Sequence, residues 1–201
     1  MKLFRIIYDL VILIIFILGI IKLFKADYFL AFIWIILVPL LMLLPRNLYK
    51  LNYIKQNYNY SLVNFFEILF FILLLTGISL TLFLKYINLD IDSFFHFINL
   101  SIYTIIFGVI YYIISSYNYK KVNKNNIIIF SLIFSLIFGV ILWEKYQSYG
   151  DKIFNTQMYY DFFQDIKLDN FLDQIFGTLG VLTGIFILYN KLEDWIRKWK
   201  K

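Results

Sequence analysis

The amino-acid sequence predicts an all-α fold, a polytopic bundle of transmembrane helices, and two observations lead to this prediction. Of the 201 residues, 62% are hydrophobic, whereas a soluble domain is about 45–50% apolar. The apolar residues form continuous runs of roughly 20, the length of helix that crosses a hydrocarbon core of about 30 Å. Helices and closed barrels both satisfy their backbone groups in lipid, and the unbroken runs favour helices because a barrel has short alternating segments.

Six apolar runs predict six spans in a single transmembrane domain that covers residues 1–201. The first run follows two basic residues, Lys2 and Arg5, as the apolar part of a signal peptide does. It is longer than a usual signal-peptide run, and no small-residue cleavage site follows it, so we expect a retained first span. The predicted spans are residues 6–24, 28–44, 62–84, 94–115, 127–146 and 171–189.

The charged residues predict the orientation of these spans. Thirteen of the 19 Lys and Arg residues fall near the two termini and in the loops after the second and fourth spans. The positive-inside rule places that side, with both termini, in the cytoplasm, which fits an even number of spans. Nine of the 13 acidic residues fall on the opposite side. Because acidic residues contribute little to topology, this bias indicates an outward-facing site.

Two cytoplasmic segments are predicted to lie at the inner membrane interface. Apolar side chains recur at helical spacing between residues 48 and 58, among basic residues. The tail at residues 195–199 combines aromatic side chains with cations. Both patterns suit the inner headgroup layer and indicate anchoring.

Candidate site residues lie at the lip of the predicted bilayer, where an ionisable side chain is costly and usually faces the bundle. Asp92 and His96 are four residues apart at the start of the fourth span, so they share a face if both are helical. In the alternative, Asp92 caps the helix and His96 is a satisfied interfacial histidine. Glu144 lies at the outer end of the fifth span, where Lys145 or Lys152 could neutralise it.

The sixth span opens with Asp169 and Asp173, and three glycines follow on the face of Asp173: Gly177, Gly180 and Gly184. Glycines on one face let another helix approach closely. Asp173 is therefore predicted to head the face that packs into the bundle, with Asp169 one turn before it. In the alternative, Asp169 only caps the span within an exposed acidic segment.

Two further acidic residues lie in predicted spans near the cytoplasmic side. Glu67 lies about two turns into the third span, and we expect it to snorkel inward or to pair with Lys50, Lys55 or another span. Asp9 is four residues after Arg5 in the first span, and this spacing predicts an ion pair between them.

Three stretches in order resemble the VanZ-like and YjdF-type bacterial membrane proteins. Residues 90–97 resemble the helix entry of those families, in which Asp is followed by His-Phe, and Trp143-Glu144 resembles their later glutamate. Residues 169–184 are similar to their closing helix, in which two Asp residues precede Gly residues. The YjdF-type version fits best, over about residues 90–190.

Two positions depart from these families. Asn170 stands where YjdF-type proteins often have Thr, and Gly177 stands where VanZ-like proteins tend to have Asn. The resemblance implies a small multi-span protein of the bacterial plasma membrane, without an established biochemical activity. VanZ-like members are associated with reduced susceptibility to glycopeptide antibiotics such as teicoplanin, which implies a place in the cell envelope.

The sequence leaves three functions open, and it does not decide whether the chain is an enzyme. In the first, an outward-facing cluster binds a divalent metal ion or a polar headgroup, because one imidazole with several carboxylates suits Zn²⁺, Mn²⁺ or Fe²⁺. Its substrate would be a lipid-linked or envelope molecule, and a metal-free version would transfer protons. The candidate ligands are His96, Asp92, Glu144, Asp169 and Asp173.

The second function is a small-solute or proton-coupled transporter, and the third is a structural network that locks spans four, five and six together. Transport needs polar residues through the bilayer, for which the candidates are Asn64, Glu67, Thr76, Ser79, Asn99, Ser101 and Thr104. The chain contains no cysteine, which excludes thiol catalysis and iron–sulfur clusters. A nucleic-acid partner is not expected, since the net charge of +6 is spread over short loops.

Overall fold

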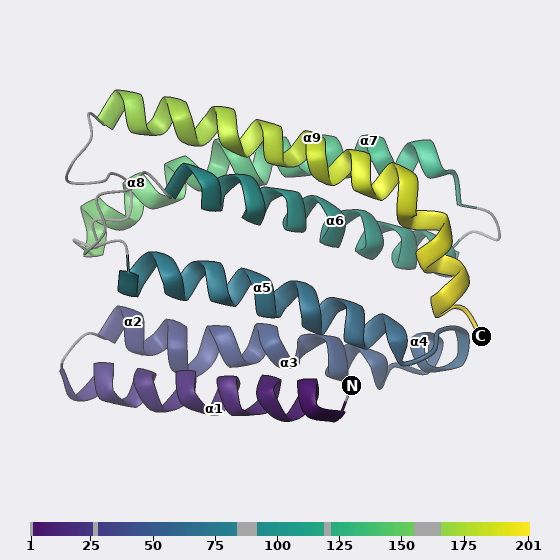
Figure 1. The fold of residues 1–201 in the computed structure, drawn as a ribbon, viewed down its shortest axis with the longest axis horizontal. Helices are drawn as coiled ribbons and strands as arrows, with labels where there is room; N and C mark the ends of the chain where they lie inside the picture. Colours follow the sequence, from purple (N-terminus) through teal and green to yellow (C-terminus); the bar gives the residue numbers. More distant parts are fainter. Residues whose placement is uncertain (1, 26–27, 84–91, 119–121, 155–165) are drawn as a thin grey trace. The chain divides into compact units, whose positions relative to one another are not determined.

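A computed structural model describes residues 2–25, 28–83, 92–118, 122–154 and 166–201, and the named elements in these ranges are all helices (Figure 1). The chain divides into two compact units. Unit 1 comprises Met1–Ile72 together with Lys198–Lys201, and unit 2 comprises Leu73–Arg197. Helices α5 and α9 each contribute residues to both units. The described part of the chain therefore confirms the predicted all-α class.

Unit 1 contains the first two predicted spans and the start of the third. Its helices are α1 (Lys2–Phe24), α2 (Tyr28–Phe32), the π-helix η1 (Ile33–Leu37), α3 (Val38–Tyr49), α4 (Asn52–Asn57) and the first half of α5 (Ser61–Phe83). Helices α2, η1 and α3 follow one another without a break, and α1 packs along them (Figure 1). The π turn ends beside Pro39, whose missing N–H interrupts the α-helical hydrogen-bond pattern at this point.

Unit 2 contains the remaining predicted spans. Its helices are the end of α5, α6 (Asp92–Asn118), α7 (Lys124–Phe134), the π-helix η3 (Ser135–Ile141), α8 (Leu142–Phe154) and α9 (Ile166–Trp199). Helices α6, α7 and α9 lie side by side (Figure 1). Their core is formed by Leu100, Val140 and Val181, with Tyr103, Leu132, Leu136 and Ile185 packed around it.

Four helices of the described part are long and apolar enough to cross a membrane: Leu3–Phe24, Ser93–Asn118, Lys124–Ile141 and Asn170–Trp199. Two shorter apolar helices, Ile33–Tyr49 and Ser61–Thr76, overlap the second and third predicted spans. Many large apolar side chains of the four long helices are exposed, among them Leu13, Ile133 and Phe186. Exposed apolar faces of this kind suit contact with lipid.

Helices α6 and α9 run parallel and come into backbone contact at two glycines. A β-carbon at Gly180 would collide with the carbonyl oxygen of Phe97, and one at Gly184 would lie 2.6 Å from the carbonyl oxygen of Ser101. Ser101 Oγ donates a hydrogen bond to the Gly180 carbonyl at 2.9 Å. At Gly177 the nearest atom is the end of a side chain, Leu100 Cδ1, at 2.8 Å. The three glycines thus lie on the face of α9 that meets the bundle.

This geometry predicts that Gly180→Ala destabilises unit 2 more than Gly177→Ala. At Gly180 the new methyl group meets backbone that cannot turn away, and such overpacking costs about 1–3 kcal/mol. At Gly177 the Leu100 side chain can change rotamer, and the gain in helix propensity offsets part of the strain. Thermal unfolding of the two variants in detergent, followed by circular dichroism, measures the difference. Equal midpoints would contradict the close approach at Gly180.

Candidate functional site

Helices α6 and α9 bring His96 and Asp173 together in unit 2. His96 Nε2 lies 3.5 Å from Asp173 Oδ2, and the two side chains are only 10% and 5% exposed. Ser93 Oγ donates a hydrogen bond to Asp173 Oδ1 at 3.0 Å. A buried carboxylate is costly unless it is hydrogen-bonded or paired. Ser93 and His96 therefore offset the cost of burying the Asp173 carboxylate.

The local sequence accounts for this arrangement. Ser93 and His96 are three residues apart in the first turns of α6, so both point to the same side of that helix. Asp173 lies about two turns into α9 and four residues before Gly177, on the face that packs against α6. The close approach at Gly180 fixes the distance between the two helices. The polar contact is thus positioned by small residues farther along the same interface.

The structure places the other predicted site residues only by their backbone. Asp92 begins α6 and Asp169 lies in the first turn of α9, one turn before His96 and Asp173 respectively. Glu144 lies near the start of α8. The side chains of these three residues are outside the described part of the structure. Among the side chains that are described, no group of three His, Asp or Glu residues could hold a metal ion.

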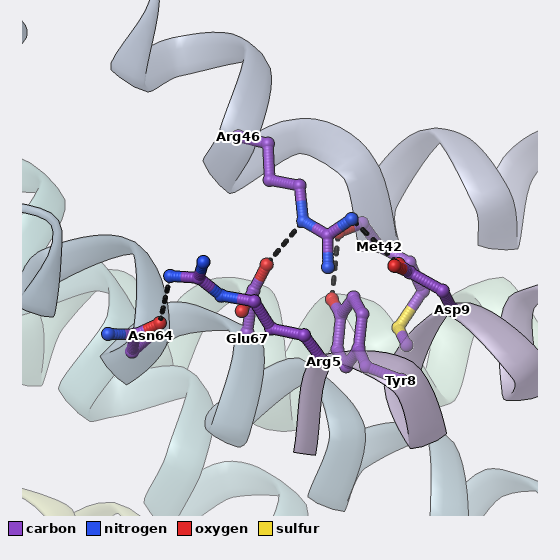
Figure 2. A network of polar contacts seen from close by, with 7 residues as sticks. All are labelled: Arg5, Tyr8, Asp9, Met42, Arg46, Asn64 and Glu67. Atoms are coloured by element: carbon purple, nitrogen blue, oxygen red, sulfur yellow. Dashed lines mark hydrogen bonds and ion pairs between the residues drawn. The ribbon is translucent and has the colours of Figure 1, made fainter. Parts of the chain in front are cut away.

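A larger polar network lies in unit 1, and Arg46 of α3 is its centre (Figure 2). Arg46 Nε donates to Glu67 Oε1 of α5 at 2.5 Å, and Nη1 donates to Asp9 Oδ1 of α1 at 2.6 Å. The Glu67 side chain is fully buried, whereas Asp9 is 54% exposed. One guanidinium therefore ties α1, α3 and α5 together, and it compensates the charge of a carboxylate that has no access to water.

Two more hydrogen bonds extend the network (Figure 2). Tyr8 Oη donates to the Met42 carbonyl at 2.7 Å, which joins α1 to α3. Arg5 Nη2 donates to Asn64 Oδ1 at 3.0 Å, which joins α1 to α5. The Arg5 guanidinium also lies over the ring of Tyr60, with Cζ 4.1 Å from the ring centroid. Such stacking favours Arg, whose planar group is less strongly hydrated than an ammonium group.

These contacts correct one prediction and resolve another. The predicted ion pair between Arg5 and Asp9 is wrong, because Asp9 pairs with Arg46 while Arg5 turns to Asn64. Glu67 does not pair with Lys50 or Lys55 but with Arg46 in the neighbouring helix. One feature of the sequence points to the pairing of Asp9 and Glu67 with Arg46. Two carboxylates in apolar runs need a cation with several directed donors, and an arginine at the end of a span provides them.

Three polar atoms of the network have no contact with solvent. Glu67 Oε2, Arg46 Nη2 and Arg5 Nε are buried and have no hydrogen-bond partner among the described residues. Side-on pairing of a guanidinium with a carboxylate makes two parallel hydrogen bonds. Only one of the two is formed between Arg46 and Glu67. The arrangement is therefore a compact ion-pair core that holds helices together.

Comparison with known proteins gives no relative. No family model matches the chain, and neither a curated protein nor a solved structure matches it. The resemblance to YjdF-type and VanZ-like proteins accordingly stays a prediction.

The Arg46 network predicts that Arg46→Ala destabilises the protein much more than Lys124→Ala does. Arg46→Ala leaves Glu67 as a buried carboxylate without its cation, and breaking such a pair costs about 3–5 kcal/mol. Lys124→Ala removes an exposed pair with Glu193, whose side chain is 71% exposed, and such pairs contribute about 0–1 kcal/mol. It also removes the contact of the Lys124 ammonium with the Tyr189 ring, which contributes about 0.5–1 kcal/mol at an exposed site. Denaturant unfolding in micelles measures both losses. Similar losses would show that Glu67 does not depend on Arg46, and the double variant Arg46→Met with Glu67→Met should recover part of the stability.

Proposed function

We propose that this chain is a six-span membrane protein of a bacterial plasma membrane, with both termini in the cytoplasm. Four helices meet the length and hydropathy of a span. The continuous helical segment at residues 28–49 and the 23-residue helix α5 supply two more, since about 20 residues cross a bilayer. The excess of Lys and Arg at the termini and in two loops supports the orientation.

We further propose that the His96–Asp173 pair is the centre of an outward-facing site that binds a cation. The observation that supports this best is the buried contact between these two ionisable side chains at the entry of two parallel helices. Asp92 and Asp169 lie one turn before them on the same helices. Three carboxylates and one imidazole favour a positive ligand, either a divalent metal ion such as Zn²⁺ or Mn²⁺ or the ammonium group of a lipid headgroup.

The chemistry of such a site follows from the ligand. A divalent metal held by His96 and Asp173 would polarise a phosphoryl oxygen or activate a water molecule. Its substrate class would be a lipid-linked or other envelope molecule that enters from the outer leaflet. A site that binds only a headgroup ammonium would leave the protein a binding module. Whether the chain is an enzyme thus depends on which cation occupies the site.

A second candidate function is structural, and one observation favours it specifically. Both carboxylate oxygens of Asp173 already have partners, Ser93 on Oδ1 and His96 on Oδ2. The contact between α6 and α9 continues through the hydrogen bond from Ser101 to the Gly180 carbonyl. In this function the polar contact sets the register of two helices and has no ligand.

Transport has less support than either function. A solute path needs polar groups that are free to face it. Thr104 Oγ1 donates to the Leu100 carbonyl at 2.7 Å, so this hydroxyl is already used within α6. Thr76 Oγ1 and Asn99 Oδ1 are hydrogen-bonded to each other at 2.6 Å. These three side chains thus serve contacts within the protein.

Elemental mass spectrometry of the purified protein, before and after incubation with Zn²⁺ or Mn²⁺, tests the cation site. We expect near-stoichiometric metal in the wild type and its loss in His96→Ala and Asp173→Asn, because each variant removes a ligand. Thr76→Val is the control, since it removes the hydrogen bond from Thr76 to Asn99 in unit 2 and leaves every proposed ligand in place, so it should keep the metal.

Thermal unfolding of the same variants separates the two functions. A folded wild type without metal, not stabilised by a vesicle headgroup such as phosphatidylethanolamine, would contradict the cation site. A large loss of stability in Asp173→Asn under those conditions would then favour the structural lock.

A further inference from the structure

The C-terminal residues return to the connection between α4 and α5, and both segments belong to unit 1 (Figure 1). Tyr58 and Lys200 form an antiparallel β-bridge. On one side of it, the Asn59 N–H donates to the Trp199 carbonyl at 2.6 Å. The Asn59 side chain also donates to the Lys198 carbonyl at 2.5 Å. We name residues 57–61 and 198–201 together the clasp.

Further contacts secure the clasp. The Lys201 N–H donates to the Asn57 carbonyl at 3.1 Å, on the other side of the bridge. Tyr58 is fully buried and Trp199 is 3% exposed. The indole of Trp199 packs on Phe65 of α5, with ring centroids 4.8 Å apart. A buried indole contributes a large apolar area, so the clasp combines directed backbone bonds with an aromatic anchor.

The clasp gathers exposed lysines from two distant parts of the sequence. Lys201 Nζ donates to the Lys55 carbonyl at 2.5 Å, so the tail lies against α4. No acidic residue occurs in residues 47–66 or 195–201. All of the lysines of these segments that belong to unit 1 are exposed: Lys50, Lys55, Lys198, Lys200 and Lys201. Like charges held together repel one another, and an anionic partner relieves this repulsion.

We propose that the clasp assembles these five lysines into one docking surface for the phosphate headgroups of anionic phospholipids in the inner leaflet. The inference rests on the proposed membrane topology, which places both termini in the cytoplasm. Two exposed apolar side chains, Leu48 and Leu51, flank Lys50 just before α4, and they suit the boundary between headgroups and acyl chains. Basic clusters of this size beside a cytoplasmic helix end attract anionic lipids. The two leucines offer apolar contacts to the acyl chains of a lipid, and a soluble polyanion has no acyl chains.

The test measures binding of phosphatidylglycerol and phosphatidylcholine to the full chain in neutral detergent, by native mass spectrometry. The charge variant is the triple change Lys55→Gln, Lys200→Gln and Lys201→Gln. We expect its apparent affinity for phosphatidylglycerol to fall on the order of fivefold for each lysine removed. Binding of phosphatidylcholine should not change. The matched control carries the same change in charge at lysines outside the proposed docking surface: Lys22→Gln, Lys25→Gln and Lys191→Gln.

Trp199→Ala tests assembly, because it opens the clasp while all five lysines remain. We expect it to lose the preference for phosphatidylglycerol as the triple variant does. Full preference in Trp199→Ala, with loss in the triple variant, would overturn the role of the clasp. Full preference in the triple variant would overturn the surface itself, whatever Trp199→Ala does. Since the triple variant keeps the buried Tyr58 and Trp199, its result stands even where Trp199→Ala fails to fold.

Two further experiments test the lipid partner and the membrane topology independently of each other. Competition by inorganic phosphate or by a short RNA as strong as that of phosphatidylglycerol would overturn the lipid as the partner. Carbonate extraction of membranes tests insertion independently of headgroup binding. A chain released by carbonate would overturn the proposed membrane topology, and with it the inference. A chain that stays inserted but shows no preference for phosphatidylglycerol would overturn the inference alone.

Discussion

A polar side chain in an apolar helix is costly unless it has a partner within the protein, because an apolar environment offers none. This constraint accounts for the described polar contacts of both units. In unit 1 the buried Glu67 is compensated by Arg46. In unit 2 the buried Asp173 is held by Ser93 and His96. Hydroxyl groups within helices follow the same rule on a smaller scale, as when Ser131 donates to the Ile127 carbonyl one turn earlier.

The two buried carboxylates differ in the basic side chain beside them, which is a guanidinium for Glu67 and an imidazole for Asp173. A guanidinium stays protonated at any physiological pH and offers five donors in a rigid fork, so Arg46 suits a permanent link between helices. An imidazole gains or loses a proton near neutrality and can ligate a metal when neutral. The contact of His96 with Asp173 is also longer, at 3.5 Å, than the 2.5 Å bond from Arg46 to Glu67. The proposed cation site is assigned to the pair that contains the imidazole.

The sequence was sufficient for features that depend on neighbouring residues and insufficient for those that depend on distant ones. Long apolar runs predicted helices where α1, α6 and α9 are found, because length and hydropathy are local properties. Spacing also predicted that Gly180 shares a face with Asp173. It could not identify α6 as the partner of that face, and it assigned Asp9 to the wrong arginine. The partner of Asp9 is 37 residues away, and no local pattern distinguishes it from the arginine one turn away. The clasp likewise depends on contacts that no single segment contains.

The clasp fixes the positions of several lysines, and the orientation of the chain in a membrane does not require such fixed positions. Orientation by the positive-inside rule depends on how many basic residues flank a span, and it requires no defined position for any of them. Lys198, Lys200 and Lys201 nevertheless have defined positions, since their backbones bond or bridge to residues 57–61. Fixing the conformation of a segment costs conformational entropy, and membrane insertion alone does not require the segment to be fixed. A surface that must present several cations together to one layer of phosphates does gain from it, because electrostatic attraction depends on the distance between charges.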